Sequence, residues 1–191
     1  YAQQYKAFVD QVRAAEEKLG KGTRLTETVA RYLHKLMAYK DEYEVARLYT
    51  DPAFMDKVNS MFEGDIKLKF HLAPPLLARK KPGSEVPAKM TFGAWLLPAF
   101  GVLARFKGLR GTALDVFGYS AERRTERALI DQYRKGIEAM LSNLSDQSRD
   151  RALAMARWPE QIKGFGHVKE RHLAQAQANW RQLTQSAGPL V

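Results

Sequence analysis

The N-terminal third of the chain places apolar residues three and four positions apart, the spacing of amphipathic helices. One such stripe ends at Gly20, which predicts the end of a first helix, and a second stripe occupies residues 25–37. Asp41 stands three residues before Glu44, a capping-box spacing that predicts the start of a third helix. The Asp-Pro pair at residues 51–52 predicts the start of a fourth, because proline is favoured at the first helical position.

The period changes to two at residues 66–72, where apolar residues alternate with lysines and a histidine. This alternation predicts a strand, which two following prolines would end. A second short extended piece is predicted around residues 89–92. Together the two pieces predict a small antiparallel β-hairpin at about residues 65–92.

Helical spacing returns in the second half of the chain. Pro98 must lie in the first turn of its helix or kink it. The predicted helices run from Trp95 to Phe106, from a cap at Ser120, from a cap at Ser145 to about Trp158, and from about His167 to Gln185, with a short one after Pro159. The predicted fold class is therefore mainly α, a bundle-like domain of about seven to eight helices with one small hairpin.

Composition refines this picture. The 191 residues fit one domain, with ordinary fractions of hydrophobic (45%) and charged (27%) residues. The chain begins at Tyr1, and we expect it to be an excised C-terminal part of a larger multidomain protein. Because it has no cysteine, disulfides, thiolate metal ligands and a cysteine nucleophile are excluded, which fits a cytoplasmic location. The longest uncharged run, 15 residues at 90–104, is shorter than the roughly 20 of a membrane span, so it predicts a core helix and no membrane contact.

The net charge of +10 is uneven along the chain. Residues 65–110 hold nine basic and two acidic side chains, which is +7 of that total. The basic run Arg79, Lys80 and Lys81 has the chemistry to hold phosphate groups. A solvated loop is the alternative interpretation of the same run.

The stretch GFGHVKERH, residues 164–172, combines two glycines with two histidines. No strand precedes the glycines, so they do not form a dinucleotide fingerprint, and a corner between helices is the favoured interpretation. His167 and His172 are five residues apart and point in different directions on a helix, which argues against a shared metal. We expect His167 or Lys169 to face an anion or a neighbouring domain.

Several blocks of the sequence resemble one known enzyme family. The blocks are RYLHKLMAYKDEYEVARLYTD (31–51), FEGD (62–65), FHLAPPLLARKKP (70–82), GTALDVFGYSAERRTERALI (111–130) and IKGFGHVKE (162–170). Together they are similar to the C-terminal domain of single-chain indolepyruvate ferredoxin oxidoreductases, over roughly residues 25–173. None of these blocks is a catalytic motif.

The resemblance implies a parent enzyme that oxidatively decarboxylates aryl-2-oxoacids such as indolepyruvate. Such an enzyme uses thiamine diphosphate and coenzyme A, and it passes electrons through an iron–sulfur cluster to ferredoxin. The implied partners are the N-terminal thiamine-binding and γ-type domains of the same chain, ferredoxin, and further copies of the parent in a homo-oligomer. No catalytic residue of the family carries over, so we expect no catalytic residue and no cofactor in this segment.

We therefore expect an accessory domain that packs on the catalytic domains of its parent. The candidate contacts for an anion or coenzyme A are Arg79, Lys80, Lys81, His167 and Lys169. This role predicts an exposed apolar patch near the hairpin or residues 39–49. The alternative is a basic nucleic-acid-binding or protein-interaction module, argued from a pI near 9.8. No helix-turn-helix or RNP signature is present, so we do not expect nucleic acid.

Overall fold

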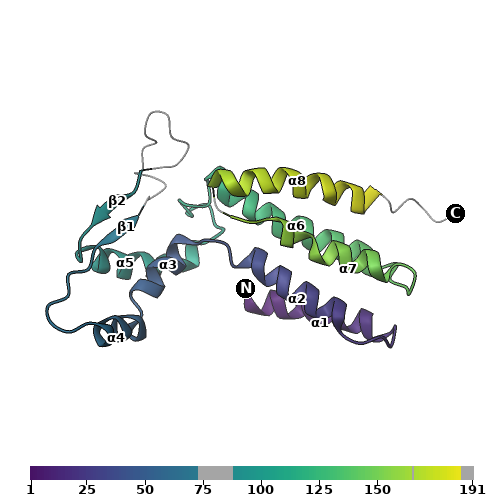
Figure 1. Cartoon of the computed structure of the whole chain (residues 1–191), viewed down its shortest axis with the longest axis horizontal. Helices are drawn as coiled ribbons and strands as arrows, with labels where there is room; N and C mark the ends of the chain where they lie inside the picture. The colour runs from purple at the N-terminus through teal and green to yellow at the C-terminus, as the bar shows by residue number, and fades with distance from the viewer. Residues whose placement is uncertain (73–87, 165, 186–191) are drawn as a thin grey trace. The chain divides into compact units, whose positions relative to one another are not determined.

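The computed structural model describes residues 1–72, 88–164 and 166–185 and is mainly helical (Figure 1). The described residues form eight α-helices, two 3-10 helices and one two-stranded antiparallel sheet. The predicted fold class is thereby confirmed. The chain divides into two compact units, which are described separately: a bundle unit, residues 1–39 with 125–191, and a hairpin unit, residues 40–124. The expectation of one domain over residues 1–191 stays a prediction.

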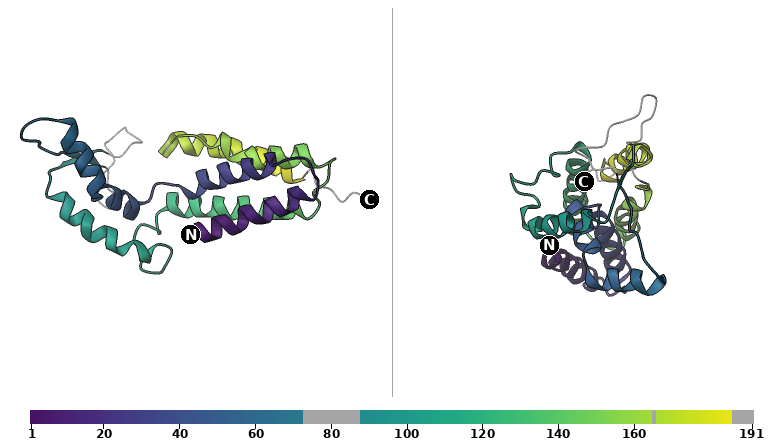
Figure 2. Two further views of the ribbon diagram at one scale, coloured as in Figure 1. Left: turned by 90° about the horizontal axis from the view of Figure 1, so that it is seen from below. Right: turned by 90° about the vertical axis from the view of Figure 1, so that its left-hand side faces the viewer.

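The bundle unit consists of long helices that run side by side (Figures 1 and 2). Its elements are α1 (Ala2–Glu17), α2 (Arg24–Met37), most of α6 (Ala121–Leu141), α7 (Arg149–Arg157), the 3-10 helix η2 (Trp158–Gln161) and α8 (Gly166–Gln185). Helix α2 packs against α1, α7 and η2. The predicted stripe on α2 is confirmed, since its apolar face (Leu25, Val29, Leu33 and Leu36) is buried in the core.

Two tryptophans fill the centre of this core. The ring centroids of Trp158 and Trp180 are 4.5 Å apart, and the indole nitrogen of Trp158 donates to the carbonyl of Ala176 at 2.6 Å. Tyr133 is fully buried, and its hydroxyl donates to the carbonyl of Ala156 at 2.8 Å. The indole nitrogen of Trp158 and the hydroxyl of Tyr133 thus each have a partner, which offsets the cost of desolvating them.

One charged side chain is buried in the bundle unit for a local reason. The carboxylate of Glu16, 1% exposed, accepts hydrogen bonds from the backbone amides of Leu25 and Thr26, each at 2.8 Å. It also accepts from the hydroxyl of Thr26 at 2.7 Å. These are the unpaired donors at the start of α2, so the carboxylate of one helix caps the next.

The hairpin unit contains the remaining elements, which are α3 (Glu42–Tyr49), α4 (Pro52–Met61), β1 (Phe70–Leu72), β2 (Met90–Phe92), α5 (Leu96–Arg105), the 3-10 helix η1 (Phe106–Leu109) and the first residues of α6. Both predicted caps are confirmed. Asp41 accepts from the amide of Glu44 at 2.7 Å, and Asp51 accepts from the amide of Ala53 at 3.0 Å. Each cap satisfies an amide that the helix itself leaves without a partner.

The first strand of the hairpin is shorter than the alternating sequence pattern predicts. The two strands pair over three residues each, with Phe70 opposite Phe92 and Leu72 opposite Met90. Continuing this register would place residues 66–69 opposite residues 93–96, where the chain has already turned into α5. Among the described residues, the alternating residues 66–69 therefore have no strand to pair with, although their pattern is that of a strand.

Two further helix starts test the predicted caps. Ser120 accepts from the amide of Arg123 at 3.2 Å at the start of α6, as predicted. Helix α7 has Ser148 as its N-cap residue, not Ser145, because Ser145 and Ser148 bond to each other in a turn that precedes the helix.

Pro98 lies in the first turn of α5, where proline is tolerated. Among the described residues, none of the helices has the length and apolar character needed to cross a membrane.

Gly136 provides a test of the bundle core. A Cβ atom at this position would overlap the ring of Trp180. Gly136→Ala should therefore lower the free energy of unfolding by about 1–3 kcal/mol, the usual cost of overpacking. Gly101→Ala in α5 is the matched control, because nothing lies within 4 Å of a Cβ there. The control should stabilise the chain by about 0.5–1 kcal/mol. Equal shifts of both variants in urea unfolding would contradict this packing.

Candidate functional site

The five residues singled out from the sequence are only partly described. Arg79, Lys80 and Lys81 lie outside the described residues, and of His167 only the backbone, in the first turn of α8, is described. Lys169 lies with its amino group 2.5 Å from a carboxylate oxygen of Glu126, in a pair that is largely buried. A contact of any of the five with an anion stays a prediction.

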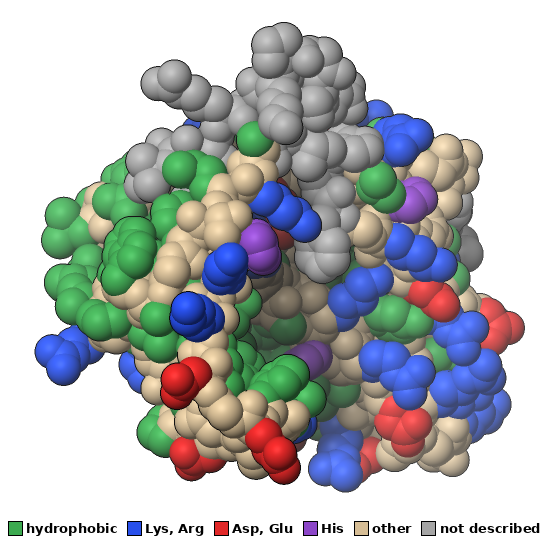
Figure 3. All heavy atoms as spheres, turned by 60° about the vertical axis from the view of Figure 1, so that its left-hand side comes forward, with side chains coloured by type: hydrophobic (Ala, Val, Ile, Leu, Met, Phe, Trp, Pro, Cys, Tyr) green, Lys and Arg blue, Asp and Glu red, His purple; other side chains and the backbone are tan. Residues whose placement is uncertain are grey.

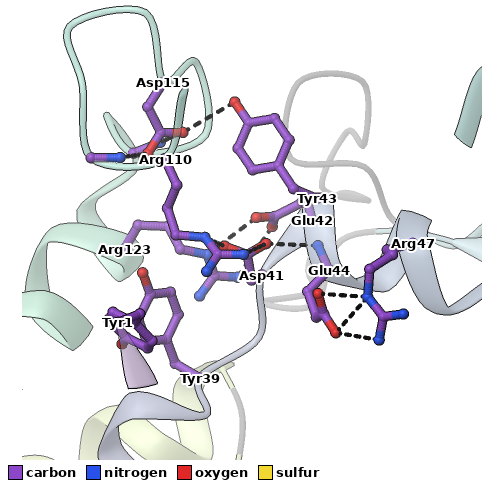
Figure 4. Close-up of polar contacts among 12 residues, drawn as sticks. Tyr1, Tyr39, Asp41, Glu42, Tyr43, Glu44, Arg47, Arg110, Asp115 and Arg123 are labelled. Carbon is purple, nitrogen blue, oxygen red and sulfur yellow. Dashed lines mark hydrogen bonds and ion pairs between the residues drawn. The ribbon is translucent and has the colours of Figure 1, made fainter. Parts of the chain in front are cut away.

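A network of charged side chains holds the start of α3 in the hairpin unit (Figure 4). Arg110 approaches Asp41 with Nε at 2.7 Å from Oδ2 and donates from Nη2 to Oδ1 at 3.0 Å. Arg123, 4% exposed, donates from Nη2 to Glu42 at 3.2 Å. These ion pairs tie α3 to the segment after α5 and to the start of α6.

A buried carboxylate orders the loop between η1 and α6. Asp115, 2% exposed, accepts from the backbone amides of Gly111 at 2.8 Å and Gly118 at 3.1 Å. It also accepts from the hydroxyl of Tyr43 at 3.3 Å. Burial and the neighbouring Asp115 raise the pKa of Tyr43, which keeps its hydroxyl protonated as a donor.

Three aromatic rings form the small core beneath the hairpin. Phe100 of α5 stacks on Tyr49 of α3 at 5.5 Å between centroids, with the planes 12° apart. Phe70 of β1 meets Phe100 edge to face at 5.7 Å and Tyr49 at 5.3 Å. This cluster joins α3, α5 and the hairpin, and it fixes which side of α5 faces inward.

The opposite side of α5 is apolar as well, and it is exposed. Trp95, Val102 and Phe106 are 65%, 55% and 49% exposed, and Pro98 and Ala99 are exposed between them. Their spacing of three and four residues puts all five on one stripe, which we call the α5 stripe. Within α5 the only charged residue is Arg105. A helix that is apolar on every side is normally covered on every side.

The hairpin unit has further exposed apolar side chains besides the α5 stripe. Among the described residues, every large hydrophobic side chain that is exposed, apart from Tyr1, belongs to the hairpin unit. The others are Leu48, Phe54, Met61, Phe62, Ile66, Met90, Leu114, Val116 and Tyr119. Figure 3 shows hydrophobic side chains gathered on the surface of the hairpin unit. Clustering of this kind marks an interaction surface more often than a free one.

This surface agrees with one sequence expectation and corrects another. An exposed apolar patch near the hairpin or residues 39–49 was expected, and Met90 and Leu48 are part of the exposed set. The uncharged run 90–104, however, was expected to be a core helix, and in α5 only Phe100 is buried. The run carried no signal for the exposed face, because an uncharged run without a polar stripe is also the pattern of a buried helix.

The structural description and a comparison with known protein families together show what kind of protein this is. It is a mainly helical chain of two compact units with exposed apolar side chains on its hairpin unit, and its described residues contain no group of three His, Asp or Glu side chains that could hold a metal ion. The model of a family of unknown function, DUF6537, matches residues 1–182, so the chain belongs to that family. Comparison with curated proteins and with solved structures gave no match.

Asp115 is the residue on which the order of the loop 111–119 depends. Asp115→Ala should lower the free energy of unfolding by about 1–3 kcal/mol, because two backbone amides lose their acceptor. Asp115→Asn, which keeps one acceptor oxygen, should cost less. Asp146→Ala removes an exposed carboxylate paired with Lys21 and should change stability by less than about 0.5 kcal/mol. Chemical denaturation of the three variants measures these differences, and an Asp115→Ala value as small as the control would contradict this role.

Proposed function

We propose that this chain is an accessory docking domain, and that its α5 stripe packs on another domain of the same enzyme. The observation that carries the proposal is that α5 is apolar on both sides while only one side is covered. On its covered side, α5 is held by the contacts of Phe100 with Tyr49 and Phe70. A pre-ordered apolar surface loses little conformational entropy when it is covered.

The composition of the stripe supports a stable contact. Complete burial of a large apolar side chain contributes about 1.5–3 kcal/mol, so Trp95, Val102 and Phe106 alone would supply several kcal/mol. Tryptophan is also among the residues that most often dominate the energy of an interface. The proposed interface therefore has its strongest contacts at the two ends of α5.

The enzyme that we propose as the parent follows from the resemblance of the sequence blocks to indolepyruvate ferredoxin oxidoreductases. In this proposal the rest of the parent holds thiamine diphosphate, coenzyme A and the iron–sulfur cluster. This chain has no cysteine and so offers no thiolate to such a cluster. Its part is to position the catalytic domains and, in the finer form of the proposal, to help bind coenzyme A or ferredoxin through its basic residues.

The docking role is tested in the full-length parent enzyme. Trp95→Ser, Val102→Ser and Phe106→Ser together should weaken domain or subunit assembly and lower turnover at least tenfold, because the apolar contact is lost. The chain itself should stay folded, since these side chains are exposed. Tyr1→Ser, which changes an exposed aromatic of the bundle unit, is the matched control and should leave both properties unchanged.

Analytical ultracentrifugation and steady-state kinetics give the two readouts, with circular dichroism as the check on folding. If the triple variant assembles and turns over substrate as the wild type does, the docking proposal is contradicted. The same assay at two salt concentrations tests the finer form, because charge-mediated binding weakens as salt rises. An apparent KM for coenzyme A and for ferredoxin that does not change with salt would contradict that form alone.

A further inference from the structure

The bundle unit has a polar hollow on the face where α2 packs against α7 and η2. Its volume is about 330 Å³. Helix α2 contributes Arg24, Thr28, Arg31 and Tyr32 to the lining, and Arg157 and Glu160 come from α7 and η2. The four α2 residues are spaced at four, seven and eight positions, so they share one side of the helix. Residues distant in the sequence thus meet at one hollow.

The three arginines of the hollow are free of internal partners. Within the described part of the chain, no hydrogen bond or ion pair involves the guanidinium of Arg24, Arg31 or Arg157. By contrast, Arg110 and Arg123 of the hairpin unit are both paired with carboxylates. A guanidinium keeps its charge at every physiological pH, so three unpaired ones create a lasting positive potential.

The two carboxylates that line the hollow, Glu27 and Glu160, offset only part of this potential, because they carry two negative charges against three positive ones. Glu27, which also lines the hollow, accepts from the hydroxyl of Thr23 at 2.7 Å. Glu160 interacts with Tyr32, whose pKa is raised by burial and by that carboxylate, so the phenol stays protonated. Lys35, one turn beyond Arg31, donates to the carbonyl of Pro159 at 2.7 Å and adds a further positive charge beside η2. Burial, with the neighbouring Lys163, lowers the pKa of Lys35.

We propose that this hollow binds the phosphate or diphosphate group of a small phosphate ester. Guanidinium groups bind phosphate oxygens in bidentate pairs, and three of them match the several oxygens of such a group. The hollow is in the size range of small-molecule sites, about 300–1,000 Å³. The carboxylates of Glu27 and Glu160 then lie where they accept hydrogen bonds from hydroxyl groups of the ester. This site is independent of the docking role of the α5 stripe, which lies in the other unit.

The test titrates inorganic diphosphate, as the probe, into the 191-residue chain and measures binding by isothermal titration calorimetry. The double variant Arg31→Gln with Arg157→Gln should weaken binding at least tenfold, because two of the three guanidiniums are lost. Arg181→Gln removes an exposed arginine elsewhere on the bundle unit and should leave the affinity unchanged. Arg31→Lys with Arg157→Lys keeps the charge but loses the bidentate geometry, so its affinity should fall between wild type and the glutamine variant.

Two competitors separate the proposal from its alternatives. A poly-glutamate peptide that binds to the same arginines more tightly than diphosphate would overturn the small-molecule site in favour of an acidic protein partner. Equal affinity for sulfate and diphosphate would overturn the assignment to phosphate esters. Undetectable diphosphate binding, or binding that the glutamine variant retains, would overturn the site altogether. Since no described residue pairs with these guanidinium groups, the variants should fold, and circular dichroism verifies that.

Discussion

The stacking of Phe100 on Tyr49 determines how α5 is oriented in the hairpin unit, and the proposed function depends on that orientation. Phe70 of β1 contacts both of these rings, so the three aromatic side chains hold α3, α5 and β1 together. With Phe100 facing inward, helical geometry places Trp95, Val102 and Phe106 on the outside. The exposed α5 stripe is therefore a direct consequence of the way this small core packs.

The two units differ in which of their side chains are buried or paired. In the bundle unit, apolar stripes face one another and even the buried carboxylate of Glu16 has three donors. In the hairpin unit Arg110, Arg123 and Asp115 all have partners, while many of the large apolar side chains outside the small core are exposed. An ordered polar network beside uncovered apolar side chains is what a preformed docking surface needs.

Much of the fold could be predicted from the sequence, because helix signals are local. The caps at Asp41, Asp51 and Ser120 were recognisable from residue type and spacing, and the period-two pattern located the hairpin. The extent of the strand could not be predicted, since it depends on where the partner strand turns into α5. The exposed side of α5 was missed because an uncharged run resembles a core helix. The polar hollow was missed because its arginines come from helices far apart in the sequence. The positions of Arg79, Lys80 and Lys81 lie outside the described residues, and their role stays a prediction.

Hydrogen–deuterium exchange over residues 94–109 tests the central claim, that the α5 stripe is covered in the working protein, most directly. The exchange should be compared between the isolated chain and the full-length parent enzyme, with peptides from α8 as the internal reference. The account predicts slower exchange of α5 and η1 in the parent and unchanged exchange on the exposed side of α8, because docking suppresses local opening of the covered helix. Identical exchange of residues 94–109 in both proteins would contradict it.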